Sequence, residues 1–132
     1  MITILKLNGT DPQLYQLVAP LVMSPPVLRF NHNYPFKTGK NYIWYIASSQ
    51  EGVVGFMPME NRSGKQIINN YYAKSLNGEE ILSLLLDHIT ADTEYKGPLL
   101  AIVQTIHQDI FARKNFKTIQ QWKLYAKMEL TR

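Results

Sequence analysis

The segment from Gln66 to Ile89 constrains the fold more than any other part of the chain. Residues 66–72 have the apolar and aromatic composition of a buried strand. Residues 73–77 are a short polar connection, and the apolar residues of 78–89 then recur with the period of an amphipathic helix. The sequence therefore predicts a strand, a loop and a helix in direct succession, the repeating unit of folds that layer helices on a sheet.

The junction of this strand and this helix is a candidate anion site. Asn77 is a candidate N-cap, and Glu80 follows three residues later, as in a capping box. The first turn of a helix carries main-chain N–H groups that have no partner within the helix, and these groups attract an anion. A capped helix packed on a sheet would explain the same residues without any ligand. The residues of the candidate site are Lys74, Ser75, Leu76, Asn77 and Gly78.

The other elements are predicted from hydrophobic periodicity and turn residues. Before the central segment we expect a strand over 1–7, a helix capped by Thr10 or Asp11, a short helix over 27–30, an irregular stretch over 31–40, and strands over 41–48, 53–60 and 65–72. After it we expect a buried strand over 99–104, a helix opened by a capping box of Thr105 and Gln108, and one long strand of period two that includes Trp122 and Leu130. Pro58 cannot donate a main-chain hydrogen bond and should lie at a bulge or an unpaired position.

This order, β-α-α-β-β-β-α-β-α-β, predicts one α/β (α+β) domain over residues 1–132, with a mixed central sheet and helices on both faces. The strands between residues 41 and 72 follow one another through short turns, so they should form an antiparallel meander. The connection through the helix at 78–89 is a crossover, which should make the strands over 65–72 and 99–104 parallel neighbours.

Composition excludes several classes of protein. The chain has no cysteine, which excludes disulfides and thiolate catalysis, and its three histidines are too far apart in sequence to predict a metal site. No apolar run is long enough to cross a membrane and no leader peptide is evident, so a cytoplasmic protein is expected. The net charge of +4 suits an anionic ligand, and equally ordinary solubility. Lys123 and Lys127 flank Tyr125 on the last strand, but no nucleic-acid motif is present, so nucleic-acid binding is not expected.

This order of elements, with the sequence IFARKNF at 110–116 before the last strand, resembles the GCN5-related N-acetyltransferase (GNAT) superfamily over nearly the whole chain. The resemblance implies acetyl-CoA as co-substrate, with its pantetheine arm between two parallel strands that splay apart and its pyrophosphate on the loop before the helix. It also implies a small-molecule or peptide amine as acceptor. A homodimer is compatible with the exposed strand edges. A binding or regulatory module of the same fold that has lost catalysis is the alternative.

The loop motif of this family is only partly present. On this chain its Gln or Arg position falls on Ala73, and its two glycine positions fall on Leu76 and Gly78, of which only Gly78 matches. Lys74 would supply a cation near the missing arginine. Glu79 suits the dipole of the helix and for the same reason competes with a bound anion. The resemblance thus places the cofactor on this loop, at a site that the missing glycine weakens.

The second family motif lies on the late helix. Gln104 falls at its asparagine position and would hydrogen-bond the cofactor arm, and Asn115 and Phe116 stand for its Gly-Phe pair. Phe111 falls at the position of a tyrosine that often protonates the leaving thiolate. That acid is therefore missing, and Phe111 would pack beside the cofactor.

The resemblance also implies the groups that perform the transfer. A main-chain N–H between Ile68 and Asn70 would polarise the thioester carbonyl. Tyr72, at the end of the site strand, would replace the missing tyrosine as acid. A base must remove a proton from the amine, and the candidates are Glu60, His32 and His107.

Overall fold

The computed structural model describes residues 1–92, 94–95 and 97–131. The strands are β1 (Thr3–Asn8), β2 (Tyr42–Ser49), β3 (Gly52–Arg62), β4 (Lys65–Ile68), β5 (Tyr72–Ala73), β6 (Pro98–Gln104), β7 (Lys117–Gln121) and β8 (Tyr125–Thr131). The helices are α1 (Pro12–Val22), α2 (Pro25–Phe30), α3 (Gly78–Ala91) and α4 (Gln108–Arg113), with short 3-10 turns η1 (Ser75–Asn77) and η2 (Thr105–His107) before the last two. Among the residues described, no helix has the length and apolar character needed to span a membrane.

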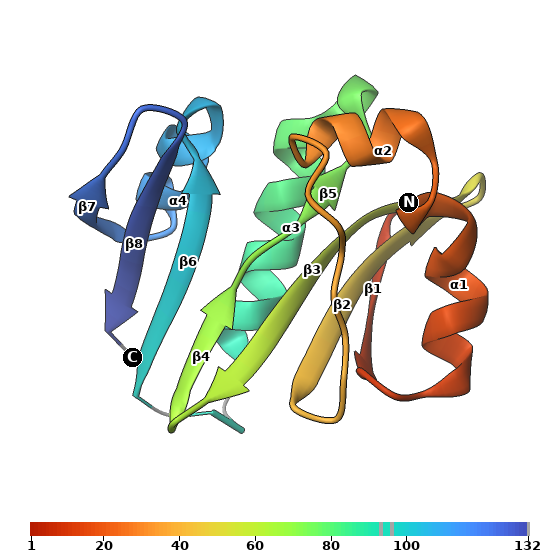
Figure 1. The fold of residues 1–132 in the computed structure, drawn as a ribbon, viewed down its shortest axis with the longest axis horizontal. Coiled ribbons are helices and arrows are strands. Elements are labelled where there is room, and N and C mark those ends of the chain that lie inside the picture. The colour runs from red at the N-terminus through yellow and green to blue at the C-terminus, as the bar shows by residue number, and fades with distance from the viewer. Residues whose placement is uncertain (93, 96, 132) are drawn as a thin grey trace.

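The strands form one mixed sheet in the order β1-β2-β3-β4-β6-β8-β7, with β5 beside β3 (Figure 1). Strands β2, β3 and β4 are antiparallel neighbours, as the predicted meander requires. Helices α1 and α2 pack on one face of the sheet, and α3 and α4 pack on the opposite face. The predicted mixed sheet with helices on both faces is confirmed.

Strand β2 shows why two helical layers are needed. Successive side chains of a strand point to opposite faces of its sheet. Trp44 and Ile46 belong to the core cluster under α1 and α2, whereas Tyr45 and Ala47 belong to the cluster under α3 and α4. All four side chains are buried, which matches the nearly continuous apolar sequence of this strand.

Helix α3 packs directly against the backbone of the sheet at its first turn. The helix begins at Gly78, as predicted, and its apolar face is buried. On β3, a Cβ atom added to Gly55 would lie 2.6 Å from Ile81 Cγ2 and 2.8 Å from the carbonyl oxygen of Tyr72. The absence of a side chain at position 55 therefore lets the start of α3 and strand β5 approach β3 closely.

Strands β4 and β6 run parallel, as predicted, and pair from Gln66 with Leu99 to Ile68 with Ala101. The predicted continuous strand over 65–72 is wrong, because it is interrupted at 69–71, where Asn70 has a φ of +58°. Beyond the interruption β5 pairs with β3, whereas β6 continues beside β8 as far as Gln104. The two strands therefore diverge, and we call the space between β5 and the end of β6 the splay (Figure 1).

Pro58 lies opposite this interruption. Its carbonyl oxygen accepts a hydrogen bond from the N–H of Asn69 at 3.4 Å, so its main chain faces the side on which β4 and β5 are separated. A residue without an N–H is tolerated there, because no carbonyl of a neighbouring strand requires one. The predicted unpaired position is confirmed.

The predicted single long strand at the end of the chain is wrong. It is a hairpin of β7 and β8, in which the N–H of Trp122 donates to the carbonyl of Tyr125 at 2.8 Å. Trp122 and Leu124 lie in the turn and are 44% and 56% exposed. Their spacing continues the period of β8, which is why the sequence pattern extended the strand across the turn.

Neither predicted capping box forms. Asn77 is the N-cap of α3, but its side chain makes no capping hydrogen bond. The 3-10 turn η2 precedes α4, so Thr105 lies before the helix, whose N-cap is His107. The Thr105 hydroxyl instead donates to the carbonyl of Lys123 at 3.5 Å, and Gln108 Nε2 donates to Gln121 Oε1 at 2.8 Å. By contrast Asp11 caps α1, as predicted, and accepts from the Gln13 N–H at 2.9 Å.

A hydrogen-bonded carboxylate ties the end of α3 to strands β1 and β2. Asp92 Oδ2 accepts from Lys6 Nζ and from the Tyr45 hydroxyl, each at 2.7 Å, and Lys6 also pairs with Glu94. Partial burial opposes ionisation of Asp92, but hydrogen bonds from Lys6, the Glu94 N–H and Tyr45 hold its pKa at about 2, below the ordinary 3.8.

Replacing Asp92 by asparagine is expected to lower the free energy of unfolding by about 1–2 kcal/mol at neutral pH. Because the pKa of Asp92 is lower in the folded than in the unfolded state, its stabilisation is present above about pH 4 and is lost as the pH falls through 2. Urea unfolding of both proteins at pH 6 and pH 2.5 measures this. The difference in unfolding free energy between the unchanged protein and the variant should shrink to about a third at pH 2.5. An equal difference at both pH values would contradict a lowered pKa for Asp92.

Candidate functional site

Two main-chain N–H groups, one on each side, point into the splay. The N–H of Lys74 donates to the carbonyl of Val54 on β3 at 2.8 Å. Because successive N–H groups of a strand point to opposite sides, the N–H of Ala73 points away from β3 and into the splay. Ala73 is only 1% exposed, and no hydrogen-bond partner for this N–H lies among the described residues. On the opposite edge the N–H of Gln104 also faces the splay. A buried N–H without a partner suits a bound carbonyl group.

The hydroxyl of Tyr71 bridges the splay. It accepts a hydrogen bond from the Gln104 N–H at 3.0 Å and lies 2.7 Å from Nδ1 of His107. No other acceptor for the hydroxyl proton lies among the described residues, so it donates to Nδ1, and the proton of His107 is then on Nε2. Burial raises the pKa of Tyr71 well above its ordinary value, and burial together with the charge of His32 lowers the pKa of His107. At neutral pH both groups are therefore uncharged.

Aromatic side chains close the splay around this bridge. The Phe30 ring, at the end of α2, stacks on His107 with ring centroids 5.5 Å apart. The Tyr71 ring lies edge-on to Phe30 and has its centroid 5.6 Å from that of Phe111. Gln104 Nε2 donates to the Phe30 carbonyl at 2.8 Å. Helix α2 thus meets η2 across the open end of the splay.

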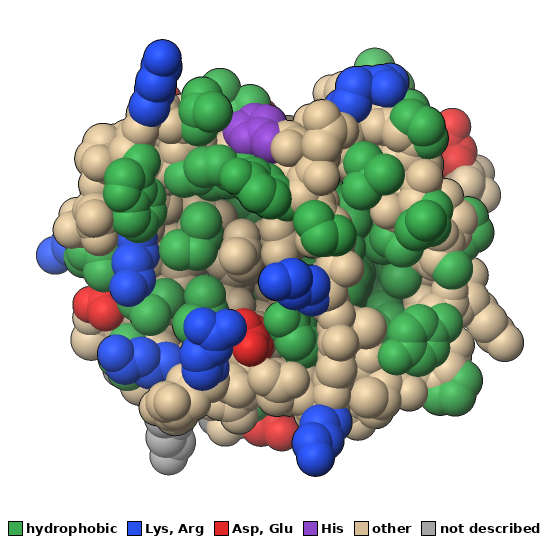
Figure 2. Space-filling view, in the orientation of Figure 1, with side chains coloured by type: hydrophobic (Ala, Val, Ile, Leu, Met, Phe, Trp, Pro, Cys, Tyr) green, Lys and Arg blue, Asp and Glu red, His purple; other side chains and the backbone are tan. Residues whose placement is uncertain are grey.

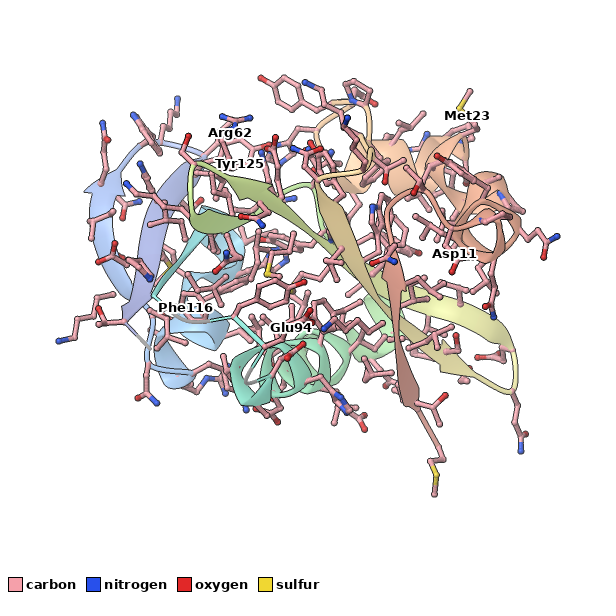
Figure 3. All side chains as sticks on the ribbon, turned by 90° about the horizontal axis from the view of Figure 1, so that it is seen from below. Asp11, Met23, Arg62, Glu94, Phe116 and Tyr125 are labelled. Atoms are coloured by element: carbon pink, nitrogen blue, oxygen red, sulfur yellow. The ribbon has the colours of Figure 1, made fainter. Side chains whose placement is uncertain are left out.

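A cavity of about 300 Å³ lies beside the splay on the face of α1 and α2. Asn69 and Asn70 line it from the interruption between β4 and β5, Ile102 from β6 and Tyr125 from β8, and the segment after α2 supplies Tyr34, Pro35 and Lys37. The Tyr125 hydroxyl lies 2.7 Å from His32 Nδ1. Figure 3 shows Tyr125 and Arg62 on the α1 and α2 side of the sheet, and Phe116 and Glu94 on the α3 side.

The loop before α3 is a 3-10 turn with mixed charges around it. Leu76, at the predicted glycine position, is 83% exposed. Lys74 lies 3.9 Å from Glu51, and Glu79 lies 3.5 Å from Arg113 of α4. A cavity of about 250 Å³ between α3 and α4 is lined by Glu79, Glu80, Ser83, Ile110, Arg113 and Lys114. Arg113 of α4 thus stands opposite a carboxylate that starts α3, whereas Lys114 pairs with Asp87, further along that helix, at 2.8 Å.

The structure brings part of the predicted site together. Gln104, Phe111 and His107 meet at the splay, and His32 and Asn70 lie at the neighbouring cavity. Ile68 ends the parallel ladder, and the N–H of Asn70 is taken by the Asn69 side chain at 2.8 Å.

Two predicted catalytic residues lie away from the splay. Tyr72 packs against Phe30 and Phe56 in the core cluster under α1 and α2. Glu60 pairs with Arg62 at 2.9 Å and accepts from Asn41 at 3.2 Å, on the same face as the cavity.

Sequence reasoning missed Tyr71, Phe30 and Tyr125. The tyrosine at 71 reaches the splay only because the strand is interrupted before it, which shifts the alternation of side chains by one position. The Asn69-Asn70 pair was the available signal, since asparagine tolerates a left-handed backbone better than most residues.

Several solved structures have the same fold. Escherichia coli ElaA superimposes with a TM-score of 0.72 at 14% identity, covering 98% of this chain and 99% of its own. Aminoglycoside 6′-acetyltransferase type Ii gives 0.69 at 15% identity, with 98% and 96% covered. Campylobacter jejuni N-acetyltransferase PseH, in complex with acetyl coenzyme A, gives 0.59 at 14% identity, with 100% and 99% covered.

No protein-family model matches the sequence, and no curated protein matches it. The assignment therefore depends on the arrangement of elements: the parallel β4 and β6, the splay beyond them, and α3 starting beside it. These features and the superpositions establish that the chain has the fold of the GCN5-related N-acetyltransferase superfamily.

Proposed function

We propose that the protein is an acetyl-CoA-dependent N-acetyltransferase that acts on a primary amine. The observation that carries this proposal is the buried N–H of Ala73, which points into the splay and has no partner within the described part of the chain. A pantetheine arm has amide carbonyls and N–H groups along its length, so it can bind a strand edge as an added strand would. The fold is that of proteins named as acetyltransferases, one of them an N-acetyltransferase in complex with acetyl coenzyme A.

The residues around the splay fit this co-substrate at its arm better than at its pyrophosphate. The N–H groups of Ala73 and Gln104 would bind carbonyl groups of the arm. For this, the N–H of Gln104 must give up its hydrogen bond to the Tyr71 oxygen and donate to a ligand carbonyl instead. The N–H groups at the start of α3, which the Asn77 side chain does not cap, would face the pyrophosphate, with Lys74 and Arg113 as nearby cations. Glu79 opposes this anion, so we expect most of the affinity to come from the arm.

The co-substrate would supply a thioester carbon that the amine attacks, with a thiolate as the leaving group. The Tyr71 hydroxyl lies beside Phe111, where the sequence lacks the usual tyrosine, and would donate to this thiolate. Its one proton is free to do so when His107 takes its other tautomer and donates from Nδ1–H to the Tyr71 oxygen, 2.7 Å away. On the amine side, His32 Nδ1 can accept a proton through the Tyr125 hydroxyl, which faces the cavity. Phe30, at the end of α2, packs against Tyr72 and stacks on His107, and it would limit the access of water to the splay.

Calorimetric titration with acetyl-CoA tests the proposal, with Gly78→Glu as the disruptive variant. A Cβ atom at Gly78 meets nothing within 4 Å, so the variant should fold, and its carboxylate should weaken acetyl-CoA binding at least tenfold. Gly78→Gln, of equal size without the charge, is the matched control and should retain most of the affinity. Equal loss in both variants would mean that bulk and not charge is what matters, and would contradict an anion site here.

The same titration also tests the second candidate function, a binding or regulatory module of this fold that has lost catalysis. Leu76 and Glu79 favour that second candidate, because they occupy the region where a pyrophosphate would lie. Absence of binding at millimolar acetyl-CoA would support it and overturn the proposal. Titration of an acetylated pantetheine, which lacks the pyrophosphate, separates the contribution of the arm from that of the loop.

A further inference from the structure

We infer that the acceptor is an amine that also carries carboxylate or phosphate groups, and that it binds in a cationic groove on the face of α1 and α2. This inference extends the proposed function, since it names the substrate class of the same site. It is carried by the shape of the face and by the charges of the side chains that line it.

The groove begins at the 300 Å³ cavity beside the splay. Two further hollows, of about 90 and 390 Å³, adjoin it through shared lining residues. Asn69 lines all three, and Lys37 and Asn70 line the first two. The groove therefore leads from the splay along β4 toward the turn between β3 and β4 and toward β8. A ligand longer than a single amino group can lie along it.

The charged lining of the groove is mostly positive. Lys37, Arg62 and Lys127 line it, against the single carboxylate of Glu60. Glu60 is already paired with Arg62 at 2.9 Å. The ammonium groups of Lys37 and Lys127 have no hydrogen-bond or ion-pair partner among the described residues. Figure 2 shows several Lys and Arg side chains over the lower half of this face, with a few acidic side chains among them.

This charge distribution suits an anionic acceptor for two reasons. Carboxylate or phosphate groups can pair with the unpartnered lysines, which orients the ligand along the groove. The same cations disfavour the protonated form of an amine placed between them, and only the neutral amine attacks a carbonyl. A polycationic acceptor such as an aminoglycoside would be repelled by both lysines, and the one carboxylate of the lining, Glu60, is already paired with Arg62.

Direct binding of charged peptides tests the inference without depending on catalysis. Two short peptides with a free amino terminus, one with two glutamates and one with two lysines, are titrated into the protein by calorimetry at low salt. The acidic peptide should bind at least tenfold more tightly, and 0.5 M sodium chloride should remove most of the difference. Phosphoethanolamine and ethanolamine, titrated in the same way, separate phosphate from carboxylate as the recognised group.

Charge-reversal variants locate the binding to the groove. Lys37→Glu and Lys127→Glu should each weaken binding of the acidic peptide about two- to fivefold. Lys117→Glu has the same change of charge outside the groove lining and should weaken binding less than either of them. Equal binding of both peptides, or equal loss in all three variants, would overturn the inference. Acetyl-CoA titration of the same variants keeps the two hypotheses apart, because a failure of co-substrate binding alone would contradict only the proposed function.

Discussion

Replacing Tyr71 by phenylalanine is expected to lower the turnover number for acetyl transfer by roughly 10²-fold, while acetyl-CoA binds at least as tightly as to the unchanged protein. Burial keeps the phenol protonated, so it can donate to the departing sulfur once His107 donates from Nδ1–H to the Tyr71 oxygen, and phenylalanine removes that donor. Phenylalanine also removes the oxygen that accepts the Gln104 N–H in the ligand-free protein, which leaves this N–H available to a ligand. Thiol release with an amine that supports turnover measures the first effect, and calorimetry measures the second.

The neighbouring tyrosine provides the matched control. Tyr72→Phe should change turnover by less than about threefold, since its ring packs against Phe30 and Phe56 and its hydroxyl makes no hydrogen bond to another described residue. A large loss for Tyr72→Phe with little for Tyr71→Phe would restore Tyr72 as the acid. His107→Asn adds a third comparison, because it removes the ring that stacks on Phe30 and leaves a side chain able to accept the Tyr71 hydrogen bond. Its effect should be smaller than that of Tyr71→Phe.

Tyr71 and Tyr72 also show which parts of the site can be predicted from the sequence. Hydrophobic periodicity placed a strand before α3 and a crossover to β6, and both are present. The side of the sheet that each side chain faces depends on the register, and one irregular residue reverses it. The left-handed backbone of Asn70 is such an irregularity, and it is stabilised by contacts far away in sequence, including the Asn31 amide at 2.9 Å from its side chain. A contact between residues 39 positions apart has no local signature.

The same reasoning explains the errors at the two capping boxes and the last strand. Thr105 and Gln108 have the right spacing for a cap, but the β7–β8 hairpin offers them stronger partners in Lys123 and Gln121. That hairpin was itself hidden, because Trp122 and Leu124 continue the alternation of β8 across a turn. The site residues supplied by one short segment were predictable, whereas the cavity, the groove and the Tyr71 bridge depend on segments that the fold brings together.

Replacing Gly55 by alanine is expected to lower the free energy of unfolding by about 2–3 kcal/mol, a fall in melting temperature of roughly 6–12 °C. The added methyl would lie 2.6 Å from Ile81 Cγ2 and 2.8 Å from the carbonyl oxygen of Tyr72, and the backbone oxygen cannot yield without moving β5. Such a movement separates β5 from β3 and displaces the start of α3. Acetyl-CoA binding should therefore fall together with stability, even though residue 55 lies outside the splay.

Gly78→Ala is the matched control for this substitution, because the same methyl meets nothing within 4 Å at the start of α3. Alanine has the higher helix propensity, so this variant should be as stable as the unchanged protein or more stable by about 0.5–1 kcal/mol. Ile81→Ala separates the two contacts at Gly55. If the helix is the main obstacle, Gly55→Ala should cost less in the Ile81→Ala background, with a coupling of about 1 kcal/mol in urea unfolding. Additive losses would mean that the Tyr72 carbonyl alone forbids the methyl, so that β5, and not α3, sets how closely the sheet is packed beside the splay.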